Sequence, residues 1–159
     1  MTAQTLDRID RKILQALMED ATLPVAQLAD RVGLSQTPCW KRVQKLEALG
    51  VITRRVAIVD PASIGLGLTV FVEIEALDHT PEWRAVMREI VRDLPAIVSV
   101  HRLAGEVDYL LKVVVPDMAA FDLFYLDLSR RLPCRNITSK FSMEVILDTT
   151  ALPIEIDVP

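Results

Sequence analysis

The spacing of apolar residues divides the first fifty residues into three helical segments. In residues 6–20 apolar side chains recur every three or four positions, so they share one face of a helix. The same spacing recurs in the shorter segments 24–32 and 35–49. Gly33 and Gly50 directly follow these two segments, at positions where a residue with positive φ ends a helix. Two short helices joined by a tight turn, behind a longer first helix, are typical of a helix-turn-helix.

The segment 35–49 predicts a helix with one buried face and one polar face. Ser35 is placed to cap it, and Pro38 falls in the first turn, where backbone N–H groups have no intrahelical partner. Cys39, Val43 and Leu46 share the buried face. The opposite side carries Thr37, Lys41, Gln44 and Ala48, with Trp40 and Lys45 at its borders. A recognition helix presents such a polar, basic surface to bases and phosphates.

The residues expected to contact DNA are polar or cationic side chains on this helix and just after it. They are Ser35, Gln36, Thr37, Lys41, Arg42, Gln44, Lys45, Arg54 and Arg55. Arg42 lies nearer the buried side, so an internal ion pair is an equal alternative to a phosphate contact. For Arg54 and Arg55 the alternative is a solvated strand edge. The helix by itself also fits an ordinary solvated surface helix.

After Gly50 the pattern changes from helical to mainly alternating. Residues 51–66 are predicted as an extended linker strand and turn, because β-branched residues are followed by turn-forming ones. Beyond them the order is β-α-β-β-α-β, the ferredoxin-like split motif. The strands are expected at 68–77, 96–103, 107–115 and 136–147, and the helices at 81–94 and 116–132.

The two faces of the predicted sheet carry different side chains, and the predicted helices can cover only one of them. In the strand 68–77 Val70 and Val72 point to one face and Phe71 points to the other. One layer of helices covers only one face of a sheet. We therefore expect a second subunit to cover the face that carries Phe71.

Charge separates the two parts of the chain. The net charge is −4 over all 159 residues, yet residues 1–60 carry a net +2 and the remainder a net −6. The basic part coincides with the predicted helix-turn-helix, which favours a nucleic acid as its partner.

Other features of the sequence exclude several classes of protein. Cys39 and Cys134 are too few and too far apart for a disulfide framework, and with His79 and His101 they match no zinc spacing. We expect reduced thiols in the cytoplasm, with Cys39 a small core residue, and neither metal nor cofactor. The polar N-terminus is not a signal peptide, and no apolar run approaches a membrane span.

The second half offers one residue of chemical interest and no catalytic constellation. No nucleophile–histidine signature or phosphate loop is present, so a small enzyme on this fold is not favoured. Asp108 follows the turn at Gly105 in an otherwise apolar run. It fits a binding site for a cationic group at a subunit edge, and it equally fits a solvated turn acid.

Two stretches together resemble the Lrp/AsnC transcriptional regulators. They are LDRIDRKILQALMEDATLPVAQLADRVGLSQTPCWKRVQKLEALGVI, residues 6–52, and AGEVDYLLKVVVPDM, residues 104–118. The resemblance implies an α+β protein: an N-terminal winged helix-turn-helix followed by a ferredoxin-like βαββαβ domain. The domains would be a DNA-binding domain at 1–50, a linker at 51–66, and an effector and oligomerisation domain at 67–159.

The resemblance also implies the partners and an effector site. The expected partners are double-stranded DNA, a small amino acid and further copies of the chain, as a homodimer that assembles into a tetramer or octamer. Amino acids would bind between dimers near the Gly-x-x-Asp turn, at Arg102, Leu103, Gly105, Glu106, Asp108 and Tyr109. Ser139, Phe141 and Ser142 would line the site from a neighbouring subunit.

The implied function is a regulator of amino-acid metabolism whose DNA binding or assembly responds to a small amino acid. The stretches TPCWKR and TTALPI are similar to the branch of the family that responds to cysteine. The alternative is an oligomeric amino-acid sensor whose N-terminal domain contacts protein in place of DNA.

Overall fold

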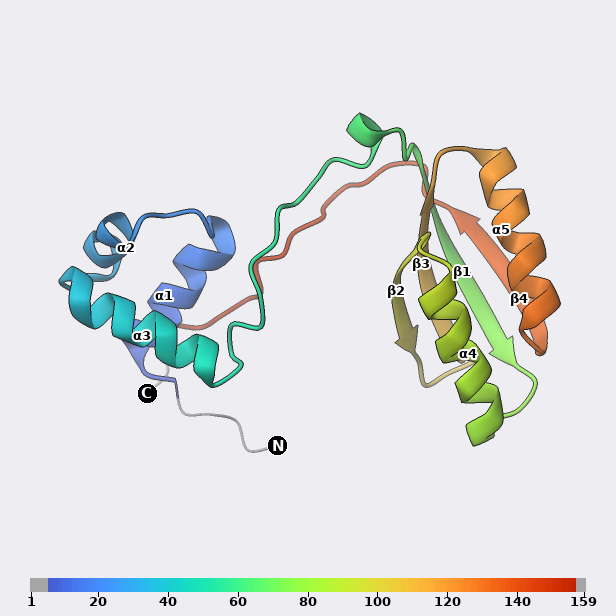
Figure 1. Ribbon diagram of the computed structural model, residues 1–159, viewed down its shortest axis with the longest axis horizontal. Helices are drawn as coiled ribbons and strands as arrows, with labels where there is room; N and C mark the ends of the chain where they lie inside the picture. Colours follow the sequence, from blue (N-terminus) through green and yellow to red (C-terminus); the bar gives the residue numbers. More distant parts are fainter. Residues whose placement is uncertain (1–5, 157–159) are drawn as a thin grey trace. The chain divides into compact units, whose positions relative to one another are not determined.

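The computed structural model describes residues 6–156, which form two compact units (Figure 1). Of these residues, the first unit contains 6–57 together with 146–156, and the second contains 58–145. Residues 1–5 and 157–159, which the predicted domains included, lie outside the described residues.

The first unit is the predicted three-helix arrangement. Its helices are α1 (Arg8–Glu19), α2 (Val25–Val32) and α3 (Gln36–Ala48). Gly33 and Gly50 have φ of 74° and 70°, as predicted for residues that end helices. The helices enclose a core built around the side chains of Ile13, Leu28, Val32, Cys39, Val43 and Leu46.

A C-terminal segment completes this unit. Ile154 packs against the helical core, and the Arg11 guanidinium donates a hydrogen bond to the Glu155 carbonyl oxygen at 2.9 Å. The structure therefore groups residues 146–156 with the helices, whereas the sequence led us to expect the segment in the effector domain. The segment that contains Ile154 has no helical or alternating pattern, so the sequence does not indicate against which core Ile154 packs.

The second unit is a four-stranded antiparallel sheet with two helices. Its elements are η1 (Ala62–Ile64), β1 (Leu68–Ala76), α4 (Pro81–Asp93), β2 (Ile97–Arg102), β3 (Tyr109–Val115), α5 (Met118–Arg131) and β4 (Cys134–Phe141). The strand order is β2-β3-β1-β4, and every neighbouring pair is antiparallel. This arrangement confirms the predicted ferredoxin-like fold.

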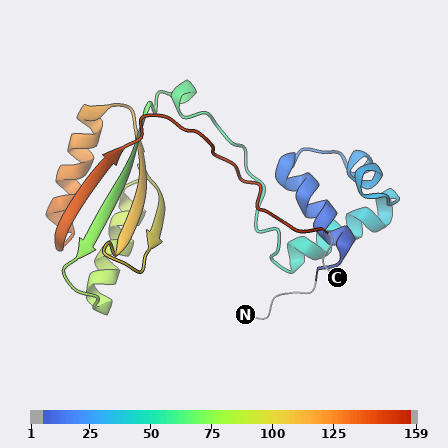
Figure 2. The same cartoon turned by 180° about the vertical axis from the view of Figure 1, so that it is seen from behind.

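Both helices cover the same face of the sheet (Figures 1 and 2). Val70, Val72 and Ile74 of β1 point into the core beneath them and are fully buried. Phe71 points the other way and is 36% exposed, while Lys140 and Glu73 form an ion pair at 2.5 Å on the same open face. The alternation predicted for this strand is confirmed. A subunit that covers the open face stays a prediction.

Two predicted strands are corrected by the structure. Residues 53–60 are not in a strand, because an extended segment needs a partner and none of the described strands pairs with it. The last strand ends at Phe141 and does not continue to residue 147. The alternating pattern of the sequence continues beyond Phe141, but the partner strand does not. Phe141 lies opposite Val70 of β1, and β1 begins only two residues before Val70, at Leu68.

Candidate nucleic-acid interface and ligand site

The outer face of α3 is polar and cationic, as the sequence predicted. Its core face is closed, since Cys39, Val43 and Leu46 are at most 1% exposed. The exposed positions between Ser35 and Ala48 are Ser35, Gln36, Thr37, Pro38, Trp40, Lys41, Gln44, Lys45, Glu47 and Ala48, and Glu47 is paired with Arg55. These residues present hydroxyl, amide and ammonium donors and acceptors to solvent on one side of one helix.

The N-terminus of α3 lacks the usual side-chain cap. Ser35 is the N-cap residue in extended conformation, yet its side chain makes no capping bond. Pro38 occupies the third helical position and has no N–H, which removes one of the two usual donors to an N-cap hydroxyl. The first turn of α3 therefore presents a hydroxyl and backbone N–H groups, which suit a phosphate oxygen.

Arg42 occupies the internal position that was one of its two alternatives. Its guanidinium donates to the Asp7 carboxylate at 2.5 Å and to the Asp10 carboxylate at 2.7 Å. These hydrogen bonds, first that to Asp7, raise the pKa of Arg42. The Asp10 side chain is only 3% exposed, so Arg42 neutralises a buried charge. Arg42 thus ties the start of α1 to the middle of α3.

The other cations after α3 differ in their surroundings. Arg55 forms an ion pair with Glu47 at 3.0 Å, and both side chains are about 40% exposed. Arg54 is exposed. An exposed ion pair contributes little stability and exchanges readily for a phosphate.

The predicted ligand turn is held by hydrogen bonds to β1. The Asp108 N–H donates to the Ile74 carbonyl oxygen at 3.0 Å, and the Asp108 carboxylate accepts from the Ala76 N–H at 2.8 Å. The Leu103 N–H donates to the Asp108 carbonyl oxygen at 2.8 Å. The other carboxylate oxygen of Asp108 lies 3.5 Å from His79 Nε2. Asp108 is therefore an anchored carboxylate that is one-quarter exposed, rather than a plain solvated acid.

The second group of predicted ligand residues lies elsewhere in the chain. Ser139, Phe141 and Ser142 belong to or follow β4, whereas Arg102 and Tyr109 lie on β2 and β3 at the other side of the sheet. Phe141 is opposite Val70, while Tyr109 is opposite Ile74, so the two groups are also displaced along β1. One chain does not bring the predicted ligand residues together.

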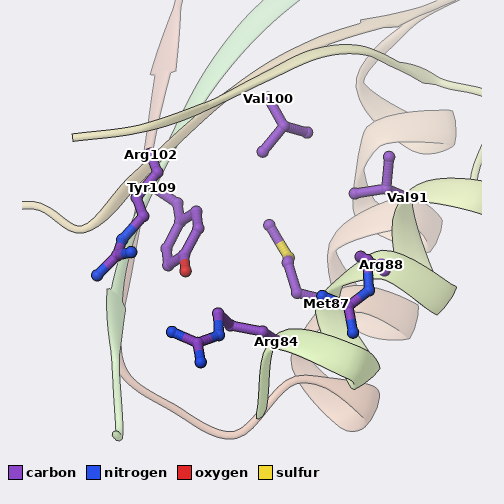
Figure 3. Close-up of a pocket in the computed structure, with 7 residues that line it drawn as sticks. All are labelled: Arg84, Met87, Arg88, Val91, Val100, Arg102 and Tyr109. Atoms are coloured by element: carbon purple, nitrogen blue, oxygen red, sulfur yellow. The ribbon is translucent and has the colours of Figure 1, made fainter. Parts of the chain in front are cut away.

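A cavity of about 360 Å³ lies between α4 and the β2–β3 side of the sheet (Figure 3). Its lining residues are Arg84, Met87, Arg88, Val91, Val100, Arg102 and Tyr109. Arg102 and Tyr109 were predicted ligand residues, whereas Arg84 and Arg88 were missed. The available signal was their four-residue spacing, continued by Arg92, which aligns three like charges along one helix.

Other groups in the described chain offer no further chemistry. Burial raises the pKa of both the Cys39 and the Cys134 thiols, which makes them poor nucleophiles. Between residues 6 and 156 no group of His, Cys, Asp or Glu side chains is arranged to hold a metal ion. No helix in this range is long and apolar enough to cross a membrane.

Comparisons with known proteins decide the family. Residues 6–47 match the AsnC-type helix-turn-helix domain, and residues 69–152 match the Lrp/AsnC ligand binding domain. The chain belongs to the Lrp/AsnC family of transcriptional regulators. It is 46% identical over 151 residues to the DNA-binding transcriptional activator DecR of Escherichia coli strain K12, covering 94% of this chain and 99% of that protein. This match is consistent with the branch of the family to which the stretches TPCWKR and TTALPI are similar.

Solved structures of the Lrp/AsnC family have the same architecture. An AsnC family transcriptional regulator from Agrobacterium tumefaciens is 51% identical with a TM-score of 0.88, covering 93% of this chain and 97% of that one. A transcriptional regulator from Neisseria meningitidis, solved as a complex with L-Met, is 37% identical with a TM-score of 0.89. That match covers 94% of this chain and 97% of the other.

Family membership assigns a role to each unit. The first unit is a helix-turn-helix of a DNA-binding class, and the second is a ligand-binding domain. The protein is accordingly a transcriptional regulator and not an enzyme.

Proposed function

We propose that the protein binds double-stranded DNA through the outer face of α3, and that a small amino acid bound between subunits modulates this binding. The proposed DNA binding rests on the hydrogen-bond donors that α3 exposes to solvent, while its opposite face is buried in the helical core. Family membership supports the amino-acid half, because the matched domain binds ligands.

The positions of the side chains on α3 suggest contacts of two kinds, to phosphates and to base edges. Lys41 and Lys45 are exposed one turn apart and suit phosphates, while Thr37 and Gln44 suit base edges. Ser35 and Gln36 lie in the uncapped first turn and suit a phosphate oxygen. Arg54 and Arg55, which follow the helix, suit phosphates of the DNA backbone. Arg42 has a different role in this proposal: it positions α3 on α1, because its guanidinium is already held by two carboxylates.

The DNA interface is tested by measuring affinity for genomic fragments as a function of salt. Replacing Lys41 or Lys45 by Ala should reduce the slope of log affinity against log salt by about one if the lysine contacts phosphate. A base contact would instead cost roughly 1–3 kcal/mol of discrimination at one position. Arg130→Ala, which removes an exposed charge from α5, is the matched control. Unchanged binding by both lysine variants would remove α3 from the interface.

The amino-acid site has requirements that the ligand turn fits. A free amino acid carries one ammonium and one carboxylate. The Asp108 oxygen on the His79 side suits the ammonium, since the other oxygen is engaged by the Ala76 N–H. Glu106 adds negative charge at the exposed turn that begins at Gly105. Arg102, Leu103 and Tyr109 flank this turn, and Ser139, Phe141 and Ser142 complete the site from another subunit.

The identity of the amino acid follows from similarity rather than geometry. The resemblance to the cysteine-responsive branch favours cysteine, whereas the relative from Neisseria meningitidis was solved with L-Met. A thermal-shift screen of the twenty amino acids decides this point, because a ligand that binds only the folded protein raises its melting temperature. We expect the largest shift from cysteine and a smaller one from methionine.

Assembly links the two halves of the proposal. A two-fold partner on the open sheet face would cover Phe71 with the same surface from the other copy. Such a dimer presents two recognition helices to half-sites about 34–36 Å apart, or a multiple of that distance. A stable monomer in light scattering at micromolar concentration would contradict this part.

One observation favours a second function. Trp40 is 47% exposed on the same face as Lys41, and exposed aromatic residues are typical of protein interfaces. In that case the first unit would contact a protein, and the chain would be an amino-acid-sensing oligomer. The two functions differ in the salt titration, because only DNA binding follows the expected log–log slope.

A further inference from the structure

The cavity between α4 and the sheet has a charge pattern that differs from that of the ligand turn. Three of its seven lining residues are arginines, Arg84, Arg88 and Arg102, and none is an aspartate or glutamate. The rest of the lining is Met87, Val91, Val100 and the buried Tyr109. The cavity therefore combines an apolar wall with uncompensated positive charge.

The three arginines lack acidic partners of the kind that Arg92 and Arg131 have in this unit. None forms a salt bridge with a residue in the described range 6–156. By contrast, Arg131 is paired with Asp93 at 2.7 Å, and Arg92 lies 3.3 Å from the same residue. Arg84 and Arg88 are also four residues apart on one helix, a spacing at which like charges repel. Figure 3 shows Arg84 directed toward Tyr109, whereas Arg88 lies near Val91.

We propose that the cavity binds a small organic acid with an apolar body and no ammonium group, such as a 2-oxo acid or a simple carboxylic acid. Guanidinium groups bind carboxylates through paired hydrogen bonds, and the Tyr109 hydroxyl adds a donor. An ammonium group would lie among three cations with no acid to receive it. A free amino acid is therefore the wrong ligand for this cavity.

The shape of the cavity matches this chemistry. Figure 3 shows Val91 and Val100 toward one end, with Arg84 and Arg102 toward the end where Tyr109 lies. The thioether of Met87 lies between them and adapts to apolar bodies of different shape. A volume of about 360 Å³ is at the small end of ligand sites and suits an acid with a short branched or aromatic body.

The experiment uses 4-methyl-2-oxopentanoate as the probe and the Met87 methyl group as a local reporter. In protein labelled with [¹³C]methyl-methionine, Met87→Leu assigns the Met87 signal among those of the five methionines. We expect the probe to shift this signal saturably. Arg84→Gln should weaken binding at least about tenfold, because it removes a charged partner of the carboxylate. The control Arg92→Gln, one turn further along than Arg88 and outside the cavity, should leave binding unchanged.

Two analogues test the charge argument. 4-Methylpentanamide keeps the apolar body without the negative charge, and L-leucine keeps the skeleton of the probe with an ammonium in place of the keto oxygen. Each should bind at least about tenfold more weakly than the probe. All titrations are repeated in Asp108→Ala, which alters the proposed amino-acid site and leaves the cavity lining intact. Retention of the probe's effect there separates this inference from the proposed function.

Three results would overturn the inference. The first is a Met87 signal that shows no saturable shift up to about 10 mM probe, a weak limit for a ligand site. The second is equal binding of the amide or of leucine in the Asp108→Ala background. The third is undiminished binding of the probe to Arg84→Gln.

Discussion

The two units of the protein complete their structures in different ways. The helix-turn-helix unit closes its own core, since Ile13, Val43 and Leu46 are all at most 1% exposed and the C-terminal segment adds Ile154. The sheet unit buries one face under α4 and α5 and leaves Phe71 half-exposed on the other. The first unit thus buries its core within itself, whereas the second leaves one face of its sheet open in the described residues.

The units also treat charge differently. In the first, Arg42 neutralises Asp10, the one buried charged residue in the described part of that unit. In the second, the arginines Arg84, Arg88 and Arg102 surround a cavity without acidic residues. The first unit therefore pairs its buried carboxylate internally, whereas the cavity of the second has positive side chains without acidic neighbours in its lining.

The largest effect is expected from removing the ion pair between Arg42 and Asp10 in the first unit. Arg42→Met should destabilise the first unit by about 3 kcal/mol, because Asp10 would keep a buried charge without a partner. With 5-fluorotryptophan, ¹⁹F NMR reports Trp40 of the first unit and Trp83 of the second separately during urea unfolding. We expect the Trp40 midpoint to fall and the Trp83 midpoint to stay. Lys45→Met is the control, and an unchanged Trp40 midpoint in Arg42→Met would show that the ion pair is unimportant.

The proposed dimer interface is tested at the open face of the sheet. Phe71→Asp should weaken self-association by about 2–4 kcal/mol, the usual cost of losing a central aromatic contact and burying a charge. Sedimentation over a concentration series measures the change. Ser129→Asp, on the exposed side of α5, should associate like the wild type. Equal association of the two variants would place the interface away from this face of the sheet.

Acid should destabilise the first unit by a smaller amount than the loss of Arg42. The N–H of Asp10 donates to the Asp7 carboxylate, and this bond is the main cause of the lowered pKa of Asp7. Because its folded pKa lies below the ordinary value of 3.8, its stabilising contribution is complete above about pH 5 and is lost as pH falls through the folded pKa. The Trp40 midpoint in urea should therefore stay constant above about pH 5 and drop as the pH falls from about 5 to 3.

The variant Asp7→Asn isolates this effect. It keeps a capping side chain but cannot titrate, and solvent screens the half-exposed ion pair that it removes. Its stability near neutral pH should therefore be lower by only about 0.5 kcal/mol, and its drop in acid should be smaller. A drop equal to that of the wild type would assign the acid sensitivity to other carboxylates.

Periodicity predicted most of the fold because most elements here bury one face. The helices α1 to α5 and the strand β1 each follow a pattern that burial confirms. The linker strand and the end of the last strand were wrong for one shared reason. Alternation predicts that a segment is extended, but a strand also needs a partner, and residues 53–60 and 143–147 have no neighbouring strand among the described residues.

The site was less predictable than the fold, because its residues meet only in three dimensions. The sequence placed Lys41 and Gln44 on the exposed face correctly, since one helix sets that geometry. It left Arg42 undecided, because its partners Asp7 and Asp10 are more than thirty residues away. The anchoring of Asp108 by Ala76 and the cavity beside Arg84 likewise depend on how distant elements pack.

The central claim is that an amino acid at the ligand turn controls DNA binding by α3. It is tested most directly by titrating genomic DNA fragments with the wild type and with Asp108→Ala, each with and without L-cysteine and the other amino acids that raise the melting temperature. In the wild type we expect the ligand to change DNA affinity by about 1–3 kcal/mol, the usual range of coupling between two sites. Asp108→Ala should bind DNA as the ligand-free wild type does and should no longer respond. An unchanged response of the variant at the same ligand concentration would contradict the account.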